Sequence, residues 1–346
     1  MRFHLTALPH TQVTRAYSAC AYTQKVLKFA NMMGDRGHEV IVYGSEENES
    51  SADLVTCITK ARQIELGFRG PEDYQGINFD ANKPLFSEFN ACIIEEMQQR
   101  IEPRDFILLS MGTSNMPIID AFPNHIRVEY GVGYTGIVAS TFKVYESYAW
   151  RHFVSGVYDT NGQFFDEVIP NYFEVDDFPP STPEDYFLYM GRLIERKGYD
   201  IAVEACRQRD RRLLLAGLGE IPDYGEYRGM VGTEERGTLM AGAIALFCPT
   251  LYVGPFEGVS VEANMCGTPV ITTDWGSYTE NVIEGFNGFR CRSMKDFHRA
   301  MDLAESVDRQ AIREWTIERF STDVVAEQYE RYFERLNTLW GQGFYE

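Results

Sequence analysis

Hydrophobic positions in the first half of the chain alternate between short apolar runs and longer stretches with helical spacing. An apolar run at 3–8 ends at Pro9, a helical pattern covers 16–33, and a second apolar run follows at 39–44. This order predicts a β-α-β unit, the building block of a parallel sheet. The same pattern then predicts one helix and two buried strands, at 84–100, 105–110 and 126–131.

The segment at 166–183 breaks the pattern, because it is rich in proline and aspartate, and we interpret it as a linker. A second alternating series of apolar runs and helical patterns follows. Strands are predicted at 186–191, 212–217, 244–249 and 268–274, and helices at 198–208, 259–266, 295–306, 309–319 and 322–340. The fold class predicted is therefore α/β, with two Rossmann-like parallel sheets.

A length of 346 residues suits two domains better than one. We place an N-terminal domain at 1–172 and a C-terminal domain at 173–325, and expect them to face each other across a cleft. Parallel α/β sheets bind ligands at the carboxyl ends of their strands, so strand ends and helix N-termini are expected to line that cleft.

The net charge of −19 is spread over both halves, and no basic stripe is visible. A nucleic-acid partner is therefore not expected. Seven cysteines are widely spaced without a zinc or redox motif, which favours reduced thiols in a cytoplasmic protein. The N-terminus lacks the apolar region of a signal peptide, and no apolar stretch is long enough to predict a membrane span.

The segment 190–198, MGRLIERKG, places two cations between the end of a predicted strand and the start of a helix. Arg192 and Lys197 at the mouth of a parallel sheet suit a pyrophosphate, which needs two or more negative charges neutralised. An ordinary solvated loop explains this segment, taken alone, equally well.

The segment 254–274, GPFEGVSVEANMCGTPVITTD, brackets a predicted helix with glycines. A glycine-flanked helix N-terminus offers backbone N–H groups to an anion. Glu262 lies about one turn into this helix, where a carboxylate can accept hydrogen bonds from sugar hydroxyls. The alternative is a plain loop-helix-strand unit with an exposed Glu262, but the occurrence of both segments together favours a binding site.

The two segments resemble glycosyltransferase family 4, the large retaining group with the GT-B fold. Its members carry a GR-LxxxKG-like turn and, further along, an E-P-F-G-x-V-x-x-E-A-x-x-x-G-x-P-V-I block, which read here as MGRLIERKG and GPFEGVSVEANMCGTPVI. The segments VIPNYF at 168–173 and LLLAGLG at 213–219 are also similar to the family. The resemblance is close over 165–335 and weaker over 1–164.

The resemblance implies a hexosyltransferase-type enzyme that moves a sugar from a UDP- or GDP-sugar to a carbohydrate or related acceptor. It implies retention of configuration and a final segment, 326–346, that crosses back onto the N-terminal domain. No metal is expected, because Arg192 and Lys197 would neutralise the leaving diphosphate and no DxD triplet ends a strand. No cofactor is expected beyond the nucleotide-sugar itself, and no GxGxxG motif supports a dehydrogenase.

The resemblance also implies roles for single residues. Arg192 and Lys197 would bind the diphosphate, Glu262 the ribose hydroxyls, and Gly232 would lie beside the base. The remaining residues of the donor site, which would contact the phosphates or the donor sugar, are Gly191, Phe256, Glu257, Gly258 and Val259.

The sequence departs from the family at Gly254, where the first glutamate of an E-x7-E pair is usual. That glutamate usually contacts the donor sugar, and Glu257 is a candidate substitute for it. A second hypothesis therefore stays open: a catalytically weak or inactive GT-B protein that binds a nucleotide or a glycan.

The acceptor side is less defined, and no general base is identified. His10 and Thr11 follow the first strand in place of the family's Gly-Gly turn, so they are expected at the acceptor side of the cleft, with His10 also a catalytic candidate. A satisfied loop histidine is the alternative for His10. Glu129 and Tyr134, in the glycine- and aromatic-rich segment VEYGVGY, are the other acceptor candidates.

Overall fold

The computed structural model describes residues 1–18, 20–68 and 79–341. The chain forms two compact units. The first unit holds Met1–Tyr145, Thr160–Ile169 and the chain from Ala326 onward, and the second holds Glu146–Asp159 and Pro170–Val325. The second unit therefore includes helix α5 (Tyr148–Val157), which lies inside the segment 1–172 that we assigned to the N-terminal domain.

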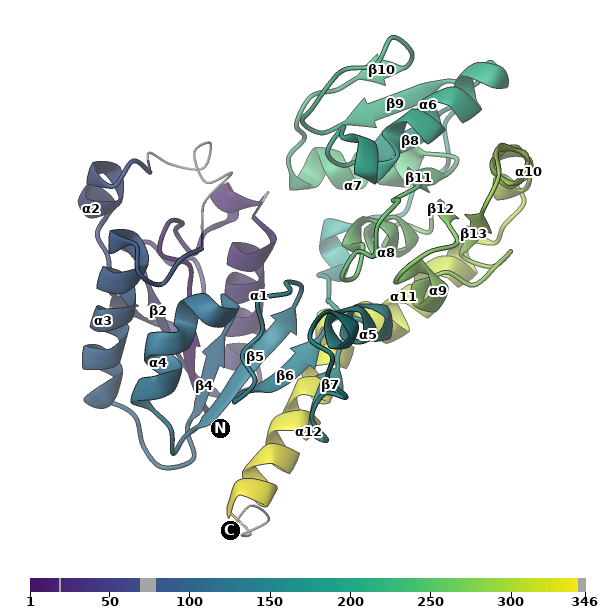
Figure 1. The fold of residues 1–346 in the computed structure, drawn as a ribbon. Coiled ribbons are helices and arrows are strands. Elements are labelled where there is room, and N and C mark those ends of the chain that lie inside the picture. The colour runs from purple at the N-terminus through teal and green to yellow at the C-terminus, as the bar shows by residue number, and fades with distance from the viewer. Residues whose placement is uncertain (19, 69–78, 342–346) are drawn as a thin grey trace. The chain divides into compact units, whose positions relative to one another are not determined.

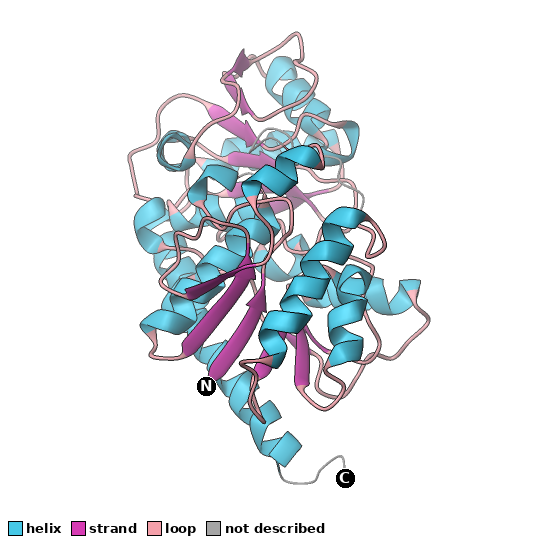
Figure 2. Cartoon of the chain, turned by 90° about the vertical axis from the view of Figure 1, so that its left-hand side faces the viewer, coloured by secondary structure: helices cyan, strands magenta, loops and turns pink. Residues whose placement is uncertain are grey.

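The first unit is built on seven parallel strands in the order β3-β2-β1-β4-β5-β6-β7. The strands are β1 (Arg2–Thr6), β2 (Glu39–Gly44), β3 (Asp53–Thr56), β4 (Phe106–Leu109), β5 (Ile126–Val132), β6 (Phe142–Tyr145) and β7 (Glu167–Val168). The helices are α1 (Ala21–Asp35), α2 (Lys60–Glu65), α3 (Pro84–Gln98) and α4 (Met116–Ala121), with 3-10 turns η1 (Arg15–Tyr17) and η2 (Gly112–Asn115). Figure 2 shows these strands side by side with helices packed against them.

The core of the first unit is strongly aromatic. Phe3 of β1 packs 5.8 Å from Phe29 of α1, measured between ring centroids. The last helix, α12 (Thr322–Gly341), belongs to this unit from Ala326 onward and adds Phe333, whose ring lies 4.8 Å from that of Phe3. The aromatic side chains of α12 thereby complete the core of the first unit. Figure 1 shows α12 in yellow at the end of the chain.

The second unit has a six-stranded parallel sheet in the order β10-β9-β8-β11-β12-β13. The strands are β8 (Phe187–Met190), β9 (Leu213–Ala216), β10 (Glu226–Tyr227), β11 (Leu246–Cys248), β12 (Val270–Thr273) and β13 (Gly288–Cys291). The helices are α6 (Tyr199–Gln208), α7 (Thr233–Gly242), α8 (Gly258–Met265), α9 (Tyr278–Asn281), α10 (Met294–Ala304) and α11 (Arg309–Phe320), with 3-10 turns η3 (Val175–Asp177) and η4 (Glu195–Lys197).

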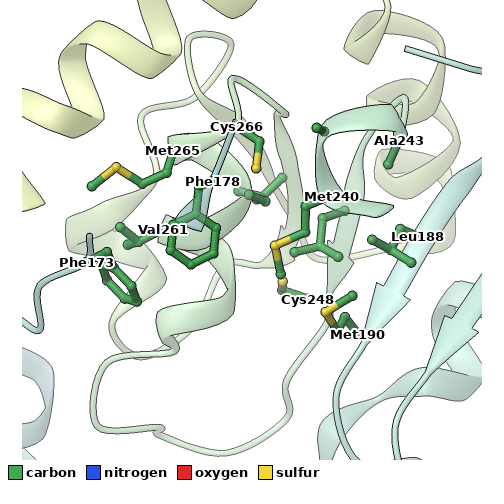
Figure 3. Packing of buried hydrophobic residues seen from close by; sticks show 14 of the residues in the cluster. Phe173, Phe178, Leu188, Met190, Met240, Ala243, Cys248, Val261, Met265 and Cys266 are labelled. Carbon is green, nitrogen blue, oxygen red and sulfur yellow. The ribbon is translucent and has the colours of Figure 1, made fainter. Parts of the chain in front are cut away.

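Both faces of the second sheet are buried. On one face Leu188, Met190 and Cys248 of the strands pack with Met240 of α7 and Val261 of α8 (Figure 3). A separate cluster of buried side chains from α6 and α10 covers the other face. A parallel sheet that is covered on both faces favours continuously apolar strands, which is why β8, β9, β11 and β12 were evident in the sequence.

The structure differs from the sequence prediction at several elements. The interpreted linker, 166–183, contains strand β7 and the turn η3. The first predicted helix, 16–33, is a 3-10 turn followed by α1, which begins only at Ala21. Strands β3, β6, β10 and β13 and helices α2, α4, α7 and α9 were not anticipated, because most of them are short and several carry charged residues.

Candidate functional site

The two motif segments meet at the carboxyl ends of the second sheet. Strand β8 leads into the segment 191–198, which we call the cation turn, and β11 leads into the segment 249–257, which we call the α8 loop. A backbone hydrogen bond joins the two segments directly, with Leu251 N–H donating to the Arg196 carbonyl over 2.9 Å. The sequence reasoning that paired these segments is consistent with this geometry.

Two glycines allow the close approach of the cation turn to its neighbours. Gly198 has a left-handed φ of 69°, and a Cβ there would overlap the carbonyl oxygen of Pro249. A Cβ at Gly217, after β9, would similarly overlap the carbonyl of Gly191. The cation turn is therefore packed between the loops that follow β9 and β11, and its side chains start from a fixed backbone.

Lys197 and Glu257 form an ion pair at the junction of the cation turn and the α8 loop. The distance from Lys197 Nζ to Glu257 Oε2 is 2.7 Å, and the two side chains are 20% and 5% exposed. Burial by itself would lower the pKa of Lys197, but attraction and hydrogen bonding to Glu257 and Tyr252 together outweigh it, and the pKa is raised. Lys197 is therefore a charged cation at neutral pH, at the end of the sheet.

The backbone and side chain of Glu257 are both unusual. Its φ of 60° lies in the left-handed region, which non-glycine residues rarely adopt. Its side chain turns back over Gly254, so that a Cβ built on Gly254 would lie only 2.7 Å from the Glu257 carboxyl carbon. The space that a side chain at 254 would occupy thus holds the carboxylate of Glu257.

Other cations lie close to this pair. Arg192 is exposed, and no ion pair involves it within the part of the chain that the structure describes. The guanidinium carbon of Arg196 and Nζ of Lys197 lie 4.8 and 5.2 Å from the centre of the Tyr252 ring. The cation turn therefore presents three positive side chains, and Tyr252 holds two of them by cation-π contacts.

Glu262 is on α8, one turn after the helix begins, as predicted. Its carboxylate is paired with the guanidinium of Arg236 on α7, and the two side chains are 13% and 33% exposed. No sequence pattern indicated this pairing, because Arg236 is in a separate helix. Gly232, predicted to lie beside the base, is the exposed N-cap of the same helix α7.

At the start of α8, the side chains pack into the second unit and the backbone N–H groups remain for a ligand. The Phe256 ring is buried in the core of the second unit, and the Phe256 carbonyl accepts a hydrogen bond of 3.2 Å from Asn281 Nδ2. Val259 also packs against that core, and a Cβ on Gly258 would lie 3.3 Å from the Phe173 ring. These three residues can therefore offer a ligand their backbone N–H groups at the start of α8.

His10 and Thr11 lie in the turn after β1 of the first unit, and both are buried. Thr11 shares a hydrogen bond of 2.7 Å with the hydroxyl of Thr23. His10 packs against the rings of Phe68 and Phe79, and burial lowers its pKa to about 4, so the imidazole is neutral. Its Nδ1 is buried without a hydrogen-bond partner in the described part of the chain.

Glu129 and Tyr134 are engaged with each other rather than open to a ligand. Glu129 on β5 is fully buried and accepts hydrogen bonds from the Tyr134 hydroxyl (2.9 Å), the Val138 N–H (2.8 Å) and the Thr141 hydroxyl (2.7 Å). Burial raises the pKa of Glu129, while these hydrogen bonds partly oppose the shift. The arrangement orders the segment after β5, and it favours a structural role for the pair over acceptor contact.

Sequence reasoning missed further residues around the site. Ser147, the N-cap of α5, donates from its hydroxyl to the Pro255 carbonyl over 2.6 Å. The carboxylate of Glu280 accepts from the N–H groups of Tyr148 and Ala149, at 2.9 and 2.7 Å. Helix α5 is far from the α8 loop in sequence, so only the folded chain shows that it supports this loop.

In the described part of the chain, no group of three or more His, Cys, Asp or Glu side chains is arranged to hold a metal ion. The same residues include no helix with both the length and the apolar composition for crossing a membrane. All seven cysteines are free thiols, and all but Cys92 are buried.

Comparison with protein families gives a match within the second unit. Residues 173–315 match the family described as "Glycosyl transferases group 1". An uncharacterized glycosyltransferase of Methanocaldococcus jannaschii is 25% identical over 166 residues, which are 43% of this chain and 41% of that protein. The chain thus aligns with less than half of this relative.

Comparison with solved structures extends over both units. Sucrose-phosphate synthase from Thermosynechococcus elongatus is 16% identical with a TM-score of 0.71, covering 97% of this chain and 99% of that one. An Anabaena protein solved in complex with UDP-glucose is 14% identical with a TM-score of 0.67, covering 97% and 100%. At these identities the likeness concerns the fold, and together with the two parallel sheets it confirms the predicted GT-B class.

Proposed function

We propose that this protein transfers a sugar from a nucleotide-sugar donor to a carbohydrate or related acceptor, with retention and without a metal ion. The observation that carries the proposal is the cation turn, where Arg192 and Lys197 lie at the carboxyl end of β8 and Lys197 pairs with the carboxylate of Glu257. Glu262, on α8 of the same unit, supplies a second carboxylate. Cations suit a diphosphate, and carboxylates suit the hydroxyls of a ribose and a hexose.

Breaking the bond between a sugar and a diphosphate builds negative charge on the departing phosphate oxygen. Fixed cations that meet this charge lower the barrier, because they need no reorganisation during the reaction. Lys197, kept charged by Glu257, and the exposed Arg192 are proposed to serve in this way. The backbone N–H groups at the start of α8 would add hydrogen bonds to the same phosphates.

Glu257 is proposed to replace the carboxylate that the resemblance places at position 254. Its carboxyl group fills the space beside Gly254, 2.7 Å from where a Cβ of that residue would be. A carboxylate held there can accept hydrogen bonds from the donor sugar while it keeps its contact with Lys197. This arrangement favours an active transferase over the inactive GT-B alternative.

The nucleotide and the acceptor are proposed from separate observations. The structural neighbour bound to UDP-glucose supports a uridine donor, and Gly232 would lie beside the base. His10 is proposed as an acceptor contact, because a neutral imidazole can accept a hydrogen bond from a hydroxyl. With a pKa of about 4 it is better suited to such a contact than to general-base catalysis.

The test combines donor binding with turnover. Thermal unfolding is followed with UDP, GDP, ADP and their glucose conjugates, and hydrolysis or transfer is measured with the conjugate that stabilises most. At 100 times its dissociation constant a ligand adds about 2.7 kcal/mol to the unfolding free energy. Lys197→Ala should lower turnover at least about tenfold, because it removes a charge-stabilising contact.

A matched control is Arg209→Ala, which removes an exposed ion pair with Asp302 at the far end of α6. It should leave binding and turnover unchanged. A well-folded Lys197→Ala protein with full turnover would refute the proposed role of the cation turn. Nucleotide binding without any turnover would support the alternative of an inactive binding protein.

A further inference from the structure

Arg236 and Glu262 form an ion pair that neither the motifs nor the family resemblance explains. Arg236 is in the first half of α7, four residues after the N-cap Gly232, and its guanidinium contacts Glu262 Oε2. Glu262 is the carboxylate that we assign to the ribose. Arg236 therefore connects Glu262, the residue proposed for the ribose, to the helix that begins after Gly232, the residue proposed for the base.

Both helices are fixed where this pair forms. A Cβ on Gly237 would lie 2.6 Å from the Asp177 carbonyl, so α7 packs closely against the turn η3 at the residue that follows Arg236. The Thr268 hydroxyl, just beyond α8, donates to the Met240 carbonyl of α7 over 2.6 Å. The two side chains thus extend from a rigid frame, which is the condition for a preorganised site.

The exposures of the two side chains argue against a purely structural pair. Arg236 is 33% exposed and Glu262 is 13% exposed, so the pair is at the surface of the second unit and not in its core. Ion pairs at such positions usually add little to stability. Arg236 Nε is also buried without a hydrogen-bond partner in the described region, so the guanidinium is not placed to satisfy all its own donors.

The pair has a clear effect on the carboxylate. A glutamate has three rotatable side-chain bonds, and binding two vicinal hydroxyls requires both of its oxygens in one fixed plane. A planar guanidinium that holds Oε2 restricts that plane before the ligand arrives. The side chain then loses its conformational entropy when the protein folds, and binding of the ligand does not have to order it.

We propose that Arg236 is a positioning residue, which holds the Glu262 carboxylate in the orientation that accepts the two ribose hydroxyls of the donor. This inference rests on the proposed function, because it requires a nucleotide in the second unit. It predicts that the preference of the protein for a ribose over a sugar without 2′- and 3′-hydroxyls depends on Arg236.

The experiment measures this preference by calorimetry. UDP, GDP and ADP are each compared with their 2′,3′-dideoxy analogues on the full chain, in the wild type and in Arg236→Ala, Arg236→Lys, Glu262→Gln and the double variant Arg236→Ala/Glu262→Gln. Removing a hydrogen bond to a charged group weakens binding about tenfold or more, so the wild type should prefer the ribonucleotide by at least this factor.

In Arg236→Ala the ribonucleotide should bind about tenfold more weakly while the dideoxy analogue binds as before, which brings their ratio close to one. Glu262→Gln should lose the same preference, and the double variant should lose no more than either single variant. Arg236→Lys should recover part of the ratio, since an ammonium can hold one carboxylate oxygen. Arg209→Ala serves as the control and should keep the full ratio.

A ratio that stays at the wild-type value in Arg236→Ala overturns the inference, and so does equal weakening of both nucleotides. Thermal melts of each variant show whether it is folded. If the alanine variant is not folded, Arg236→Lys tests the inference, because its ratio should then lie between the wild-type value and one. If the wild type binds none of the three nucleotides, the proposed function fails as well. If it binds one and only the Arg236 effect is missing, this inference alone fails.

Discussion

Exchanging the residues at 254 and 257 tests how the α8 loop supplies its carboxylate. The singles are Gly254→Glu and Glu257→Gly, and the double variant Gly254→Glu/Glu257→Gly moves the carboxylate three residues back. In the wild type a Cβ at 254 would lie 2.7 Å from the carboxyl carbon and 3.0 Å from Cγ of Glu257. Gly254→Glu must therefore displace the Glu257 side chain from its place.

The cost of displacement follows from the Lys197–Glu257 pair. A hydrogen bond to a charged group contributes about 1.5–3 kcal/mol, and these side chains are only 20% and 5% exposed, so screening is modest. Gly254→Glu should therefore lower the unfolding free energy by about 1–3 kcal/mol. Glu257→Gly loses the same pair, but regains about 1 kcal/mol because glycine adopts the left-handed φ of 60° without strain.

The double variant should reverse both effects. Its residue 257 is a relaxed glycine, and its residue 254 directs a carboxylate into the space that Glu257 has left. We expect each single variant to lose about tenfold or more in donor turnover, and the double variant to recover most of that loss. The interaction free energy in the double-mutant cycle should be at least about 1 kcal/mol.

The measurements are chemical denaturation for the unfolding free energy and single-turnover kinetics with the donor identified by thermal shift. Gly156→Glu on α5 is the control, because a side chain there meets no atom within 4 Å. Effects of the two single variants that simply add in the double variant would refute the reasoning. That result would mean that the carboxylates at 254 and 257 do not share one position.

Three further predictions concern the pKa of Lys197, the hydrogen bond of Ser147 to the α8 loop, and the pKa of His10. Glu257→Gln should move the alkaline limb of the activity profile to lower pH, because burial then lowers the pKa of Lys197 without an opposing carboxylate. Ser147→Ala should raise the KM for the donor several-fold and cost about 1 kcal/mol of stability, because it frees the Pro255 carbonyl and uncaps α5. The unfolding free energy of the wild type should fall between pH 6.5 and about 4, by up to about 3 kcal/mol, because His10 takes up a proton more easily when unfolded. His10→Gln should reduce this fall.

Each of these predictions has an outcome that contradicts it. An alkaline limb that is unchanged in Glu257→Gln would mean that Lys197 is not the group whose deprotonation ends activity. A Ser147→Ala protein with lower stability but the wild-type KM would limit that serine to capping α5. For His10, the comparison is with His152→Gln, whose side chain is exposed, and an equal reduction of the acid slope in both variants would refute the assignment.

The elements that could be predicted from sequence are those whose burial is uniform. Strand β2 and the strands β8 and β9 are continuous apolar runs, because helices cover both faces of their sheets. Strand β6 was missed because its sequence, FKVY, contains a lysine. Lys143 is nevertheless buried, and its ammonium donates to the Thr141 carbonyl over 2.7 Å. No sequence pattern distinguishes such a buried lysine from one in a loop.

In the candidate site, too, the sequence indicates residues within a motif but not their contacts with distant parts of the chain. Arg192, Lys197 and Glu262 were evident from spacing within short motifs, and the structure places them around one sheet edge. The contacts of Glu262 with Arg236, and of Pro255 with Ser147, join residues that are far apart in the chain. Glu129 was assigned to the acceptor side because glycines and aromatics surround it in sequence, but those neighbours enclose its carboxylate. Composition predicted the environment of Glu129 and not the direction of its side chain.

Glu257 differs from the other non-glycine residues that have a positive φ. Four non-glycine residues in the described chain have a positive φ, and three of them, Arg104, Asp159 and Asp210, are exposed turn residues. Glu257 alone among these four has a buried side chain, at 5% exposure, and it ends on Lys197. A left-handed non-glycine residue costs about 1–3 kcal/mol and persists only where other contacts fix it. Here those contacts converge on the place where the donor sugar is proposed to bind, so the strain is best explained by the need to direct a carboxylate there without a side chain at Gly254.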